Sequence, residues 1–376
     1  MVKLQPDKDL EKLVCVKDFA ADASNKLSKN ALEYFQSGAD DEVTLRENST
    51  AFQRWKIIPR VFRDVSKRKI SSTVLGKEVS IPVGVSPMGF QRVASFEGEI
   101  DTAKAAAAAG SIFTLSTFAT TSIEDVAKAI PNGRKWLQLF IFANKAIVES
   151  LIRRAEENGF EAIVITVDSQ YVGKRRANAR KPFKLPRHLK IANFDPPIGL
   201  PEGVVSNDFS NISHLHNDLD FRMTWDIVHW LKKATKLPII LKGILSPKDA
   251  ELAVENCVAG IWISNHGGRA LDHGISTIDM LPQIREKVGN KIEVYIDGGI
   301  HKGSDVFKAL ALGANMVFMG RPFIWGLASG SEAGAKKIFE IIEEELDSTM
   351  ALAGVKCISA IKDVYVANTP TMRCNL

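Results

Sequence analysis

Cysteine is scarce in this chain, and its spacing excludes two kinds of stabilising site. The 376 residues include four cysteines, which lie far apart and form no Cys-x-x-Cys pair. Disulfide frameworks and structural zinc sites depend on several cysteines at short, regular spacings. We therefore expect neither a disulfide scaffold nor a bound metal, and we expect a protein that resides in a reducing compartment.

Long apolar runs are also missing. No window approaches the roughly 18 uncharged apolar residues that a membrane-spanning helix needs. The N-terminal residues lack the apolar core of a secretory signal peptide. These absences predict a soluble intracellular protein that is not secreted and has no stable membrane insertion.

Neither sign of charge predominates. The chain carries 49 Lys and Arg against 44 Asp and Glu, for a net charge of +5. This balance argues against nucleic acid as the main partner. With 45% hydrophobic residues, the composition is that of a globular protein, and its length suits one large domain or two ordinary ones.

Apolar runs of strand length alternate with helical patterns along most of the chain. The runs are Ile81–Ser86, Ser111–Ser116, Trp136–Ile141, Ala162–Asp168, Pro238–Gly243, Gly260–Asn265, Glu293–Gly298 and Met316–Arg321. Helical patterns lie at Glu97–Ala109, Lys145–Asn158, Ser246–Asn256, Thr277–Val288 and Gly303–Leu312. Most runs begin 22 to 33 residues apart, but 76 residues separate the starts of the fourth and fifth. This alternation predicts an α/β fold, a parallel (β/α)8 TIM barrel with a long excursion after strand four.

The two ends of the chain complete this layout. Residues 1–75 precede the first predicted strand, and they predict an N-terminal helical extension packed on the barrel. One of its helices is expected at Ala31–Gly38, ending at a glycine. Residues 76–376 are assigned to the barrel, and its last helix is expected at residues 334–352.

Residues suited to ligand binding follow every predicted strand. They are Pro87-Met88-Gly89, Ser116, Gln138, Thr166 with Asp168, Lys242, Ser264 with His266, Asp297-Gly298-Gly299, and Gly320-Arg321. Active sites of such barrels lie at the C-terminal ends of the strands. Turn chemistry alone does not predict a complete ring of such residues, so we expect the active site there.

The segment after the sixth strand carries the most specific chemistry. His266 can act as a base near neutral pH, and Arg269 can grip a carboxylate with two parallel hydrogen bonds. Gly267 and Gly268 between them allow a sharp turn beside a ligand. The spacing favours proton removal from a small acid, although a histidine without catalytic function is the alternative.

Other strand ends leave two interpretations each. Lys242 could form a Schiff base with a substrate, or it could be a fixed positive charge that faces an anion such as a reduced flavin. The histidine and arginines at the other strand ends favour the second interpretation. Asp168 suits a helix N-cap, or a carboxylate that orients His266, with Arg175 as a second carboxylate clamp. The glycine turns after strands seven and eight, with Arg321, favour a phosphate site.

Together these motifs closely resemble one enzyme family. The segments are SNHGGR (264–269), LPIILKG (237–243), DGGI (297–300), ALALGA (309–314) and MGRP (319–322). They resemble the FMN-dependent L-2-hydroxy acid oxidases, which include glycolate, long-chain hydroxy acid and lactate oxidases, over about residues 19–354. The resemblance implies oxidation of an L-2-hydroxy acid to a 2-oxo acid, transfer of electrons from FMN to oxygen to give hydrogen peroxide, and a homotetramer.

The resemblance also implies roles for individual residues. His266 would be the catalytic base oriented by Asp168, Tyr34 the active-site tyrosine, and Lys242 the cation that stabilises reduced FMN. Arg175 and Arg269 would bind the substrate carboxylate. The residues implied for FMN are Pro87, Met88, Gly89, Ser116, Gln138, Thr166, Lys242, Ser264, Asp297, Gly298, Gly299, His301, Gly320 and Arg321.

Three positions depart from the family pattern. Phe140 replaces a tyrosine whose hydroxyl contacts substrate, Phe118 replaces a common tryptophan, and His301 stands where arginine is usual near the FMN phosphate. Because the base, both clamps and the lysine are present, we predict an active enzyme. We expect Phe140 and Phe118 to make the substrate pocket more apolar and to favour larger hydroxy acids over glycolate.

Three alternative functions remain open at the level of sequence. The first is a hydroxy acid dehydrogenase that passes electrons to a quinone or a protein instead of oxygen. The second is a flavin-binding protein with reduced turnover or none, which the Phe140 and His301 departures motivate. The third is a flavin-dependent isomerase, although two carboxylate clamps speak against it.

Two further segments are relevant to the surface of the protein and to its location in the cell. Lys174–Lys190 carries eight Lys or Arg and no acidic residue, and we interpret it as a solvated, mobile loop in which Arg175 is functional. A lid over the site and attraction of anionic substrates or membranes are alternatives. The C-terminal Cys374-Asn375-Leu376 is a loose relative of the peroxisomal Ser-Lys-Leu signal, so a peroxisomal or cytoplasmic location is expected.

Overall fold

A closed parallel barrel forms the centre of the molecule. The computed structural model describes residues 10–171, 173–194 and 218–369. Within them the barrel strands are β4 (Val83–Val85), β5 (Ile112–Leu115), β6 (Arg134–Leu139), β7 (Ile163–Thr166), β8 (Ile239–Ile244), β9 (Gly260–Ile263), β10 (Glu293–Ile296) and β11 (Met316–Met319). Each strand pairs in parallel with its neighbours, and β11 closes the barrel on β4. The predicted (β/α)8 barrel is confirmed.

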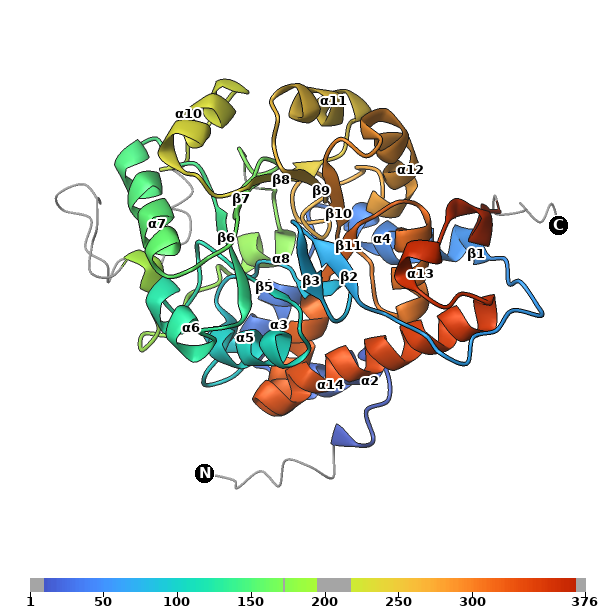
Figure 1. Cartoon of the computed structure of the whole chain (residues 1–376). Coiled ribbons are helices and arrows are strands. Elements are labelled where there is room, and N and C mark those ends of the chain that lie inside the picture. The colour runs from blue at the N-terminus through green and yellow to red at the C-terminus, as the bar shows by residue number, and fades with distance from the viewer. Residues whose placement is uncertain (1–9, 172, 195–217, 370–376) are drawn as a thin grey trace.

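Helices alternate with these strands and surround the barrel (Figure 1). They are α5 (Glu99–Ala108), α6 (Ile123–Ala129), α7 (Lys145–Glu157), α10 (Asp226–Ala234), α11 (Pro247–Glu255), α12 (Thr277–Val288), α13 (Gly303–Ala311) and α14 (Arg321–Ala353). The side chains of Ser122, Asn144 and Ser246 accept hydrogen bonds from the first turns of α6, α7 and α11. Such caps satisfy backbone donors that the helix itself leaves free, and they fix where each helix begins.

Aromatic side chains from four strands fill one part of the barrel. Trp136, Trp262, Tyr295 and Phe318 are fully buried and belong to a cluster that includes Val74 and Val79 of the preceding hairpin. Gly84 of β4 makes room for them, since a Cβ there would lie 2.5 Å from the Phe318 ring. Because the strand residues are buried on both faces, their near-continuous apolar sequence follows from the fold.

The N-terminal extension is less purely helical than predicted. It contains α2 (Val16–Lys26), α3 (Lys29–Gln36) and α4 (Val43–Arg54), but also strands β1 (Trp55–Ile57) and β2 (Ser72–Val74). β1 pairs with β12 (Val366–Asn368), and β2 forms a hairpin with β3 (Lys77–Val79). Three-residue strands are too short to show a period of two, so the sequence pattern missed them.

The last barrel helix begins earlier than expected. α14 starts at Arg321, directly after β11, and lies beside α2 at the lower edge of Figure 1. Gly330 and Ser331 have non-helical backbone angles and kink the helix. Because the kink interrupts the helical periodicity of the sequence, the first half of the helix was not predicted. The correction matters because it places Arg321 in the first turn of a helix.

The basic segment Lys174–Lys190 is anchored, and its interpretation as a purely solvated loop is wrong. Its charged side chains are largely exposed, and it contains the short helix α8 (Arg176–Arg180). However, Phe183, Leu185 and Leu189 are buried, and the Phe183 ring stacks on Tyr34 with centroids 4.2 Å apart. The segment therefore packs over the N-terminal extension next to the strand ends.

Short 3-10 turns complete the described chain at Gln91–Val93, Ala192–Phe194, Ile358–Ala360 and Asp363–Tyr365. None of the helices in the described ranges is long and apolar enough to cross a membrane.

Candidate active site

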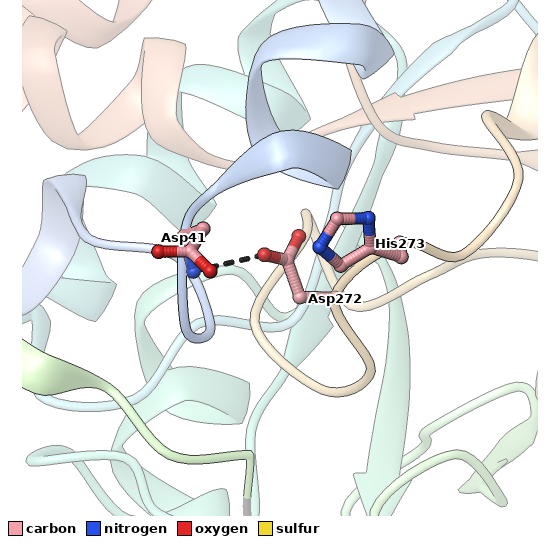
Figure 2. A group of neighbouring side chains, drawn as sticks. All are labelled: Asp41, Asp272 and His273. Carbon is pink, nitrogen blue, oxygen red and sulfur yellow. Dashed lines mark hydrogen bonds between the residues drawn. The ribbon is translucent and has the colours of Figure 1, made fainter.

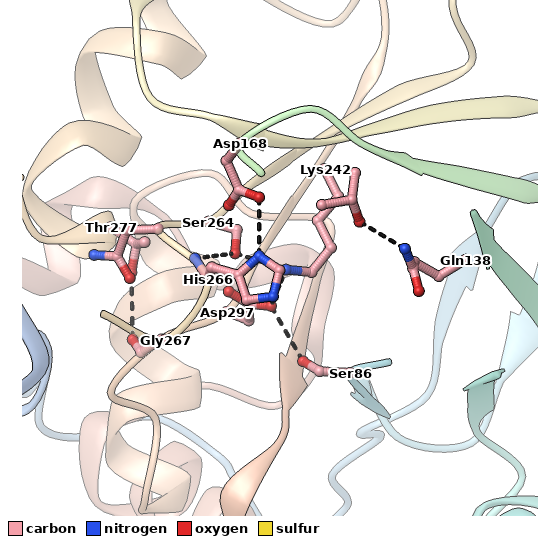
Figure 3. A network of polar contacts seen from close by, with 12 residues as sticks. Ser86, Gln138, Asp168, Lys242, Ser264, His266, Gly267, Thr277 and Asp297 are labelled. Atoms are coloured by element: carbon pink, nitrogen blue, oxygen red, sulfur yellow. Dashed lines mark hydrogen bonds and ion pairs between the residues drawn. The ribbon is translucent and has the colours of Figure 1, made fainter. Parts of the chain in front are cut away.

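A cavity opens at the C-terminal ends of the barrel strands and gathers most of the predicted site. The predicted residues that line it are Tyr34, Pro87, Met88, Gly89, Ser116, Phe118, Gln138, Phe140, Thr166, Arg175, Lys242, His266, Arg269, Asp297, Gly298, Gly299, His301, Gly320 and Arg321. Asp168 and Ser264 are not part of the lining. They hydrogen-bond to the lining residues Lys242 and His266 (Figure 3).

His266 forms a partly buried pair with Asp168. Its Nδ1 lies 2.9 Å from Asp168 Oδ1, and the Ser169 hydroxyl lies 3.0 Å from both atoms. Burial alone would raise the Asp168 pKa, but His266 and Lys242 hold this pKa below its ordinary value. An ionised carboxylate only accepts hydrogen bonds, so Nδ1 carries the proton and Nε2 is left with a free lone pair. His266 is therefore arranged as a base.

Glycines give the histidine loop its shape. His266 and the following Gly267 and Gly268 all have positive φ angles of 58° to 73°. The neighbouring loop comes very close, since a Cβ on Gly173 would lie 2.2 Å from the carbonyl oxygen of Ala270. Larger residues at these positions would push apart the two loops that carry His266 and Arg175.

Lys242 is held as a cation at the end of β8. Its Nζ lies 2.8 Å from the Ser264 hydroxyl and 3.2 Å from Asp297 Oδ2, and the side chain is 5% exposed. Ser86 donates a further hydrogen bond to the same Asp297 oxygen (Figure 3). An ammonium group paired in this way serves as a fixed positive charge, which favours the electrostatic interpretation over a Schiff base.

Three arginines converge on the cavity without a carboxylate partner. Within the described ranges, no ion pair involves Arg175, Arg269 or Arg321. Burial, followed by repulsion from Arg175, lowers the pKa of Arg269 well below its ordinary value and that of Arg321 to about 10. The Arg175 Nε is buried with no hydrogen-bond partner. A cluster of partly buried cations, one of them with an unused buried donor, calls for an anionic ligand.

The C-terminal end of α3 fixes two of these arginines. Arg269 Nη1 donates to the carbonyl of Tyr34 at 2.7 Å and that of Ser37 at 2.9 Å. Arg321 Nε donates to the carbonyl of Phe35 at 2.9 Å. The last carbonyls of a helix attract cations, so the N-terminal extension orients the arginines of the barrel.

The loops after β10 and β11 form an end suited to phosphate. Gly298 and Gly299 have φ angles of 91° and 82°, and α14 starts at Arg321 with its N-terminus at the cavity. Backbone donors at a helix start bind phosphate. Asp297 Oδ1 is buried without a partner, so it can accept a hydrogen bond from a polyol hydroxyl such as those of a ribityl chain.

His301 lies at the same end and is neutral. Burial, with repulsion from Arg321 and Lys302, lowers its pKa to about 4. Its Nε2 lies 3.2 Å from the Ser49 hydroxyl, and its backbone N–H donates to Asp305. A histidine therefore supplies a hydrogen bond here without adding the full charge of an arginine.

Buried amide and hydroxyl groups line the opposite side. Gln138 donates to Thr166 at 3.0 Å and accepts from the Thr117 backbone at 3.2 Å, while Ser116 is 5% exposed. Together with Lys242 they offer the mixed donors and acceptors that a flavin ring edge needs.

Aromatic rings form the apolar wall. Phe118 and Phe140 stack with centroids 5.0 Å apart and planes 20° apart. Tyr34 lies between the Phe183 ring and the Arg269 guanidinium, which is 5.2 Å from the Tyr34 centroid. The cavity therefore joins cationic clamps to an apolar surface.

Sequence reasoning missed Ser169 and Ser49. Ser169 immediately follows Asp168, and its hydroxyl beside a proposed His–Asp pair was a signal that could have been used. Ser49 lies in α4, far from the strand-end motifs, and no spacing pointed to it. Only the folded chain brings it to His301.

One group outside the cavity has metal-ligand geometry. Asp41, Asp272 and His273 bring their ligand atoms together near the start of α4 (Figure 2). Asp272 already accepts hydrogen bonds from the backbone N–H groups of Asp41 and Thr44, both at 2.9 Å, and Arg176 pairs with Asp41. Asp272 thus ties the histidine loop to α4.

The sequence matches the model of the FMN-dependent dehydrogenase family over residues 23–368. This chain belongs to that family. Its cofactor is FMN, and the donors described above fit the ring, the ribityl chain and the phosphate of that molecule.

Known proteins resemble the chain over nearly its full length. It is 42% identical to human 2-hydroxyacid oxidase 1 over 363 residues, which cover 96% of this chain and 98% of that protein. It is 43% identical to glycolate oxidase 1 of Oryza sativa subsp. japonica over 351 residues, 93% and 95% of the two chains. A mandelate oxidase crystal structure superposes with a TM-score of 0.85 at 34% identity, covering 94% of this chain and 98% of that one.

Proposed function

We propose that this protein oxidises an L-2-hydroxy acid to a 2-oxo acid, using FMN and then oxygen, with release of hydrogen peroxide. One observation carries the proposal. A histidine base oriented by an ionised aspartate lines the same cavity as two arginines without carboxylate partners and a buried, paired lysine. The names of the relatives, 2-hydroxyacid oxidase and glycolate oxidase, support the same chemistry.

Each side chain has a distinct task in this proposal. Arg175 and Arg269 bind the substrate carboxylate, and Tyr34 lies beside them to contact the substrate. His266 Nε2 accepts a proton from the substrate, and Asp168 stabilises the imidazolium that results. FMN, when bound, supplies the two-electron acceptor, and Lys242 contributes positive charge where negative charge develops.

The cofactor assignments follow the cavity in the same way. Gln138, Thr166, Ser116 and the Pro87–Gly89 loop are assigned to the ring, with Ser264 supporting Lys242. Asp297 and Gly298 are assigned to the ribityl chain. The phosphate is assigned to Gly299, His301, Gly320 and Arg321.

We further propose that the substrate side chain is larger and more apolar than that of glycolate. Phe118 and Phe140 offer a stacked aromatic wall without a hydroxyl group. The similarity to mandelate oxidase structures, one of which contains (S)-mandelic acid, agrees with this direction.

An anaerobic flavin titration tests the function. L-2-Hydroxy acids of increasing chain length are added to the purified yellow protein, and air is then admitted. Bleaching followed by recovery with peroxide release is expected, with larger acids giving the highest kcat/KM. Bleaching with slow recovery would favour a dehydrogenase with another acceptor. No bleaching by any acid would reject the function, and highest kcat/KM for glycolate would reject the size preference.

The assembly and location remain proposals as well. We propose a homotetramer, and light scattering of the purified protein tests it. The C-terminal Cys374-Asn375-Leu376 lies outside the described residues. We propose a peroxisomal location, with cytoplasmic as the alternative, and imaging a fluorescent fusion with and without these three residues distinguishes them.

A further inference from the structure

Glu99 is a buried carboxylate that the proposed chemistry does not use. It is the first residue of α5, and its side chain is completely buried. It accepts hydrogen bonds from the backbone N–H groups of Gln91 at 3.0 Å and Thr120 at 2.8 Å. The hydroxyls of Thr120 and Thr121 donate to it at 2.8 and 2.9 Å. Burial raises its pKa, and these hydrogen bonds oppose that rise. A carboxylate served by four donors is costly to disturb.

The donors lie directly after two different loops of the active-site cavity. Gln91 directly follows the loop after β4, whose residues 87–90 line the cavity. Thr120 and Thr121 directly follow the loop after β5, which contributes Ser116 and Phe118 to the lining. Glu99 therefore joins two neighbouring walls of the cavity from behind.

Further hydrogen bonds connect these loops to each other and to residues that line the cavity. Gln91 Nε2 contacts the carbonyl of Met88 at 3.4 Å, and the Arg92 backbone N–H donates to the Thr120 hydroxyl at 3.1 Å. The backbone N–H of Phe90 donates to the carbonyl of Phe118 at 3.2 Å. The two loops are thus cross-linked directly beside the residues that face the ligand.

The loops also lie so close that they cannot move further toward each other. A Cβ on Gly89 would lie 3.0 Å from the carbonyl oxygen of Phe118. The Phe118 ring in turn stacks on Phe140. A change in the spacing of the loops would therefore move the aromatic wall.

We propose that Glu99 is a positioning residue that holds the β4 and β5 loops together and thereby fixes the Phe118 wall for the substrate side chain. This inference rests on the proposed function. A short hydroxy acid needs the arginines and the base but does not reach the wall, whereas a bulky apolar acid packs against it. Loss of Glu99 hence affects bulky substrates more than short ones.

Asp101 provides a matched control. It lies two residues away in the first turn of the same helix, is also buried, and accepts a hydrogen bond from Ser95. Its described hydrogen bond goes to Ser95, in the connection between β4 and α5, and among the described residues it has none to the loop after β5, so it does not join the two loops. If acids in this turn only stabilise the start of α5, substitutions of Asp101 and Glu99 will have the same consequences.

The experiment compares Glu99→Gln, the milder Thr120→Val and the control Asp101→Asn in the FMN-loaded enzyme. Glycolate and (S)-mandelate serve as short and bulky probes. We expect Glu99→Gln to lower kcat/KM for mandelate about tenfold relative to glycolate, mainly through KM. Thr120→Val changes the ratio in the same direction and carries the test if Glu99→Gln fails to fold. Asp101→Asn leaves the ratio unchanged.

Hydrogen exchange followed by mass spectrometry gives a readout that needs no turnover. Exchange at residues 88–93 and 116–121 is expected to accelerate in Glu99→Gln and in Thr120→Val, and to stay unchanged in Asp101→Asn. An unchanged substrate ratio, or unchanged exchange in these two loops, would overturn the proposal. If no hydroxy acid reduces the wild-type flavin, the proposed function fails, and the exchange rates alone still decide whether Glu99 positions the loops.

Discussion

At the scale of single residues, the most informative positions are those where we expect this chain to depart from the family pattern. Phe140 and His301 both line the cavity, and they are the positions where the sequence resemblance leads us to expect a tyrosine and an arginine. Neither departure removes the base or the carboxylate clamps. Each should therefore tune the enzyme instead of disabling it, and each can be tested by a single substitution.

Phe140→Tyr is expected to raise kcat/KM for short hydroxy acids. The added hydroxyl would enter the cavity beside Phe118 and could hydrogen-bond the substrate, a contribution of about 1 kcal/mol or roughly fivefold in rate. Steady-state kinetics with glycolate measure the effect, and a bulky apolar acid serves as the control because it gains less. Unchanged glycolate kinetics would mean that the hydroxyl is dispensable in this chain.

His301 is expected to make the FMN-free protein sensitive to acid. Its pKa falls from 6.5 in the unfolded chain to about 4 in the folded one, so only the unfolded chain binds the proton between these values. The free energy of unfolding should drop by at most about 3 kcal/mol as pH falls from about 6.5 to about 4. Urea unfolding at pH 7.5 and pH 4.5 measures the drop.

His301→Gln is the control for this pH effect, since glutamine can still hydrogen-bond Ser49 but does not titrate. The variant should lose less stability on acidification than the wild type does. Equal losses in the two proteins would show that groups other than His301 cause the acid sensitivity.

At the scale of elements, the basic segment after β7 contacts the active site through the ring of Phe183. Phe183 stacks on Tyr34 and lies 6.0 Å from the Phe90 ring, centroid to centroid. The exposed charges of the segment gave no hint of this contact, because a periodic apolar face was missing. Its position links the excursion to a residue proposed to touch substrate.

Phe183→Ala is expected to raise KM for hydroxy acids severalfold while FMN affinity stays the same. The loss of an aromatic pair worth about 0.5–1.5 kcal/mol frees the Tyr34 ring from its stacked position. Leu185→Ala is the matched control, since Leu185 is buried in the same segment. Equal effects of the two substitutions would indicate a general loosening of the segment and not a role through Tyr34.

At the scale of the whole molecule, we propose that the N-terminal extension and the barrel form one cooperative unit. α2 packs along α14, β1 pairs with β12, and the carbonyls at the end of α3 bind Arg269 and Arg321. Each of these contacts joins residues from the extension to residues from the barrel. Separating the two parts would expose apolar surface and leave buried arginines without acceptors.

The full chain is therefore expected to unfold in a single transition, and residues 76–369 expressed alone should not form a stable FMN-binding barrel. Calorimetry of the full chain and flavin binding by the fragment measure these outcomes. Two separate transitions, or a fragment that binds FMN with native affinity, would contradict this view.

The barrel could be read from sequence because its strands are buried on both faces and its helices follow at regular intervals. The strand-end residues could be listed for the same reason, since parallel strands bring their C-terminal ends to one edge. Contacts between distant segments could not be read, including Ser49 with His301, Phe183 with Tyr34, and Glu99 with the β5 loop. They depend on how loops pack, and no local period encodes that.

The central claim is that His266, oriented by Asp168, takes the proton of an arginine-bound hydroxy acid. Rapid anaerobic mixing of wild-type and His266→Asn enzyme with the preferred acid measures it most directly, after FMN loading of both is shown to be equal. Flavin reduction in the variant should slow by about 100-fold to 10,000-fold, as expected for loss of a general base. A variant that reduces its flavin within about threefold of the wild-type rate would contradict the account.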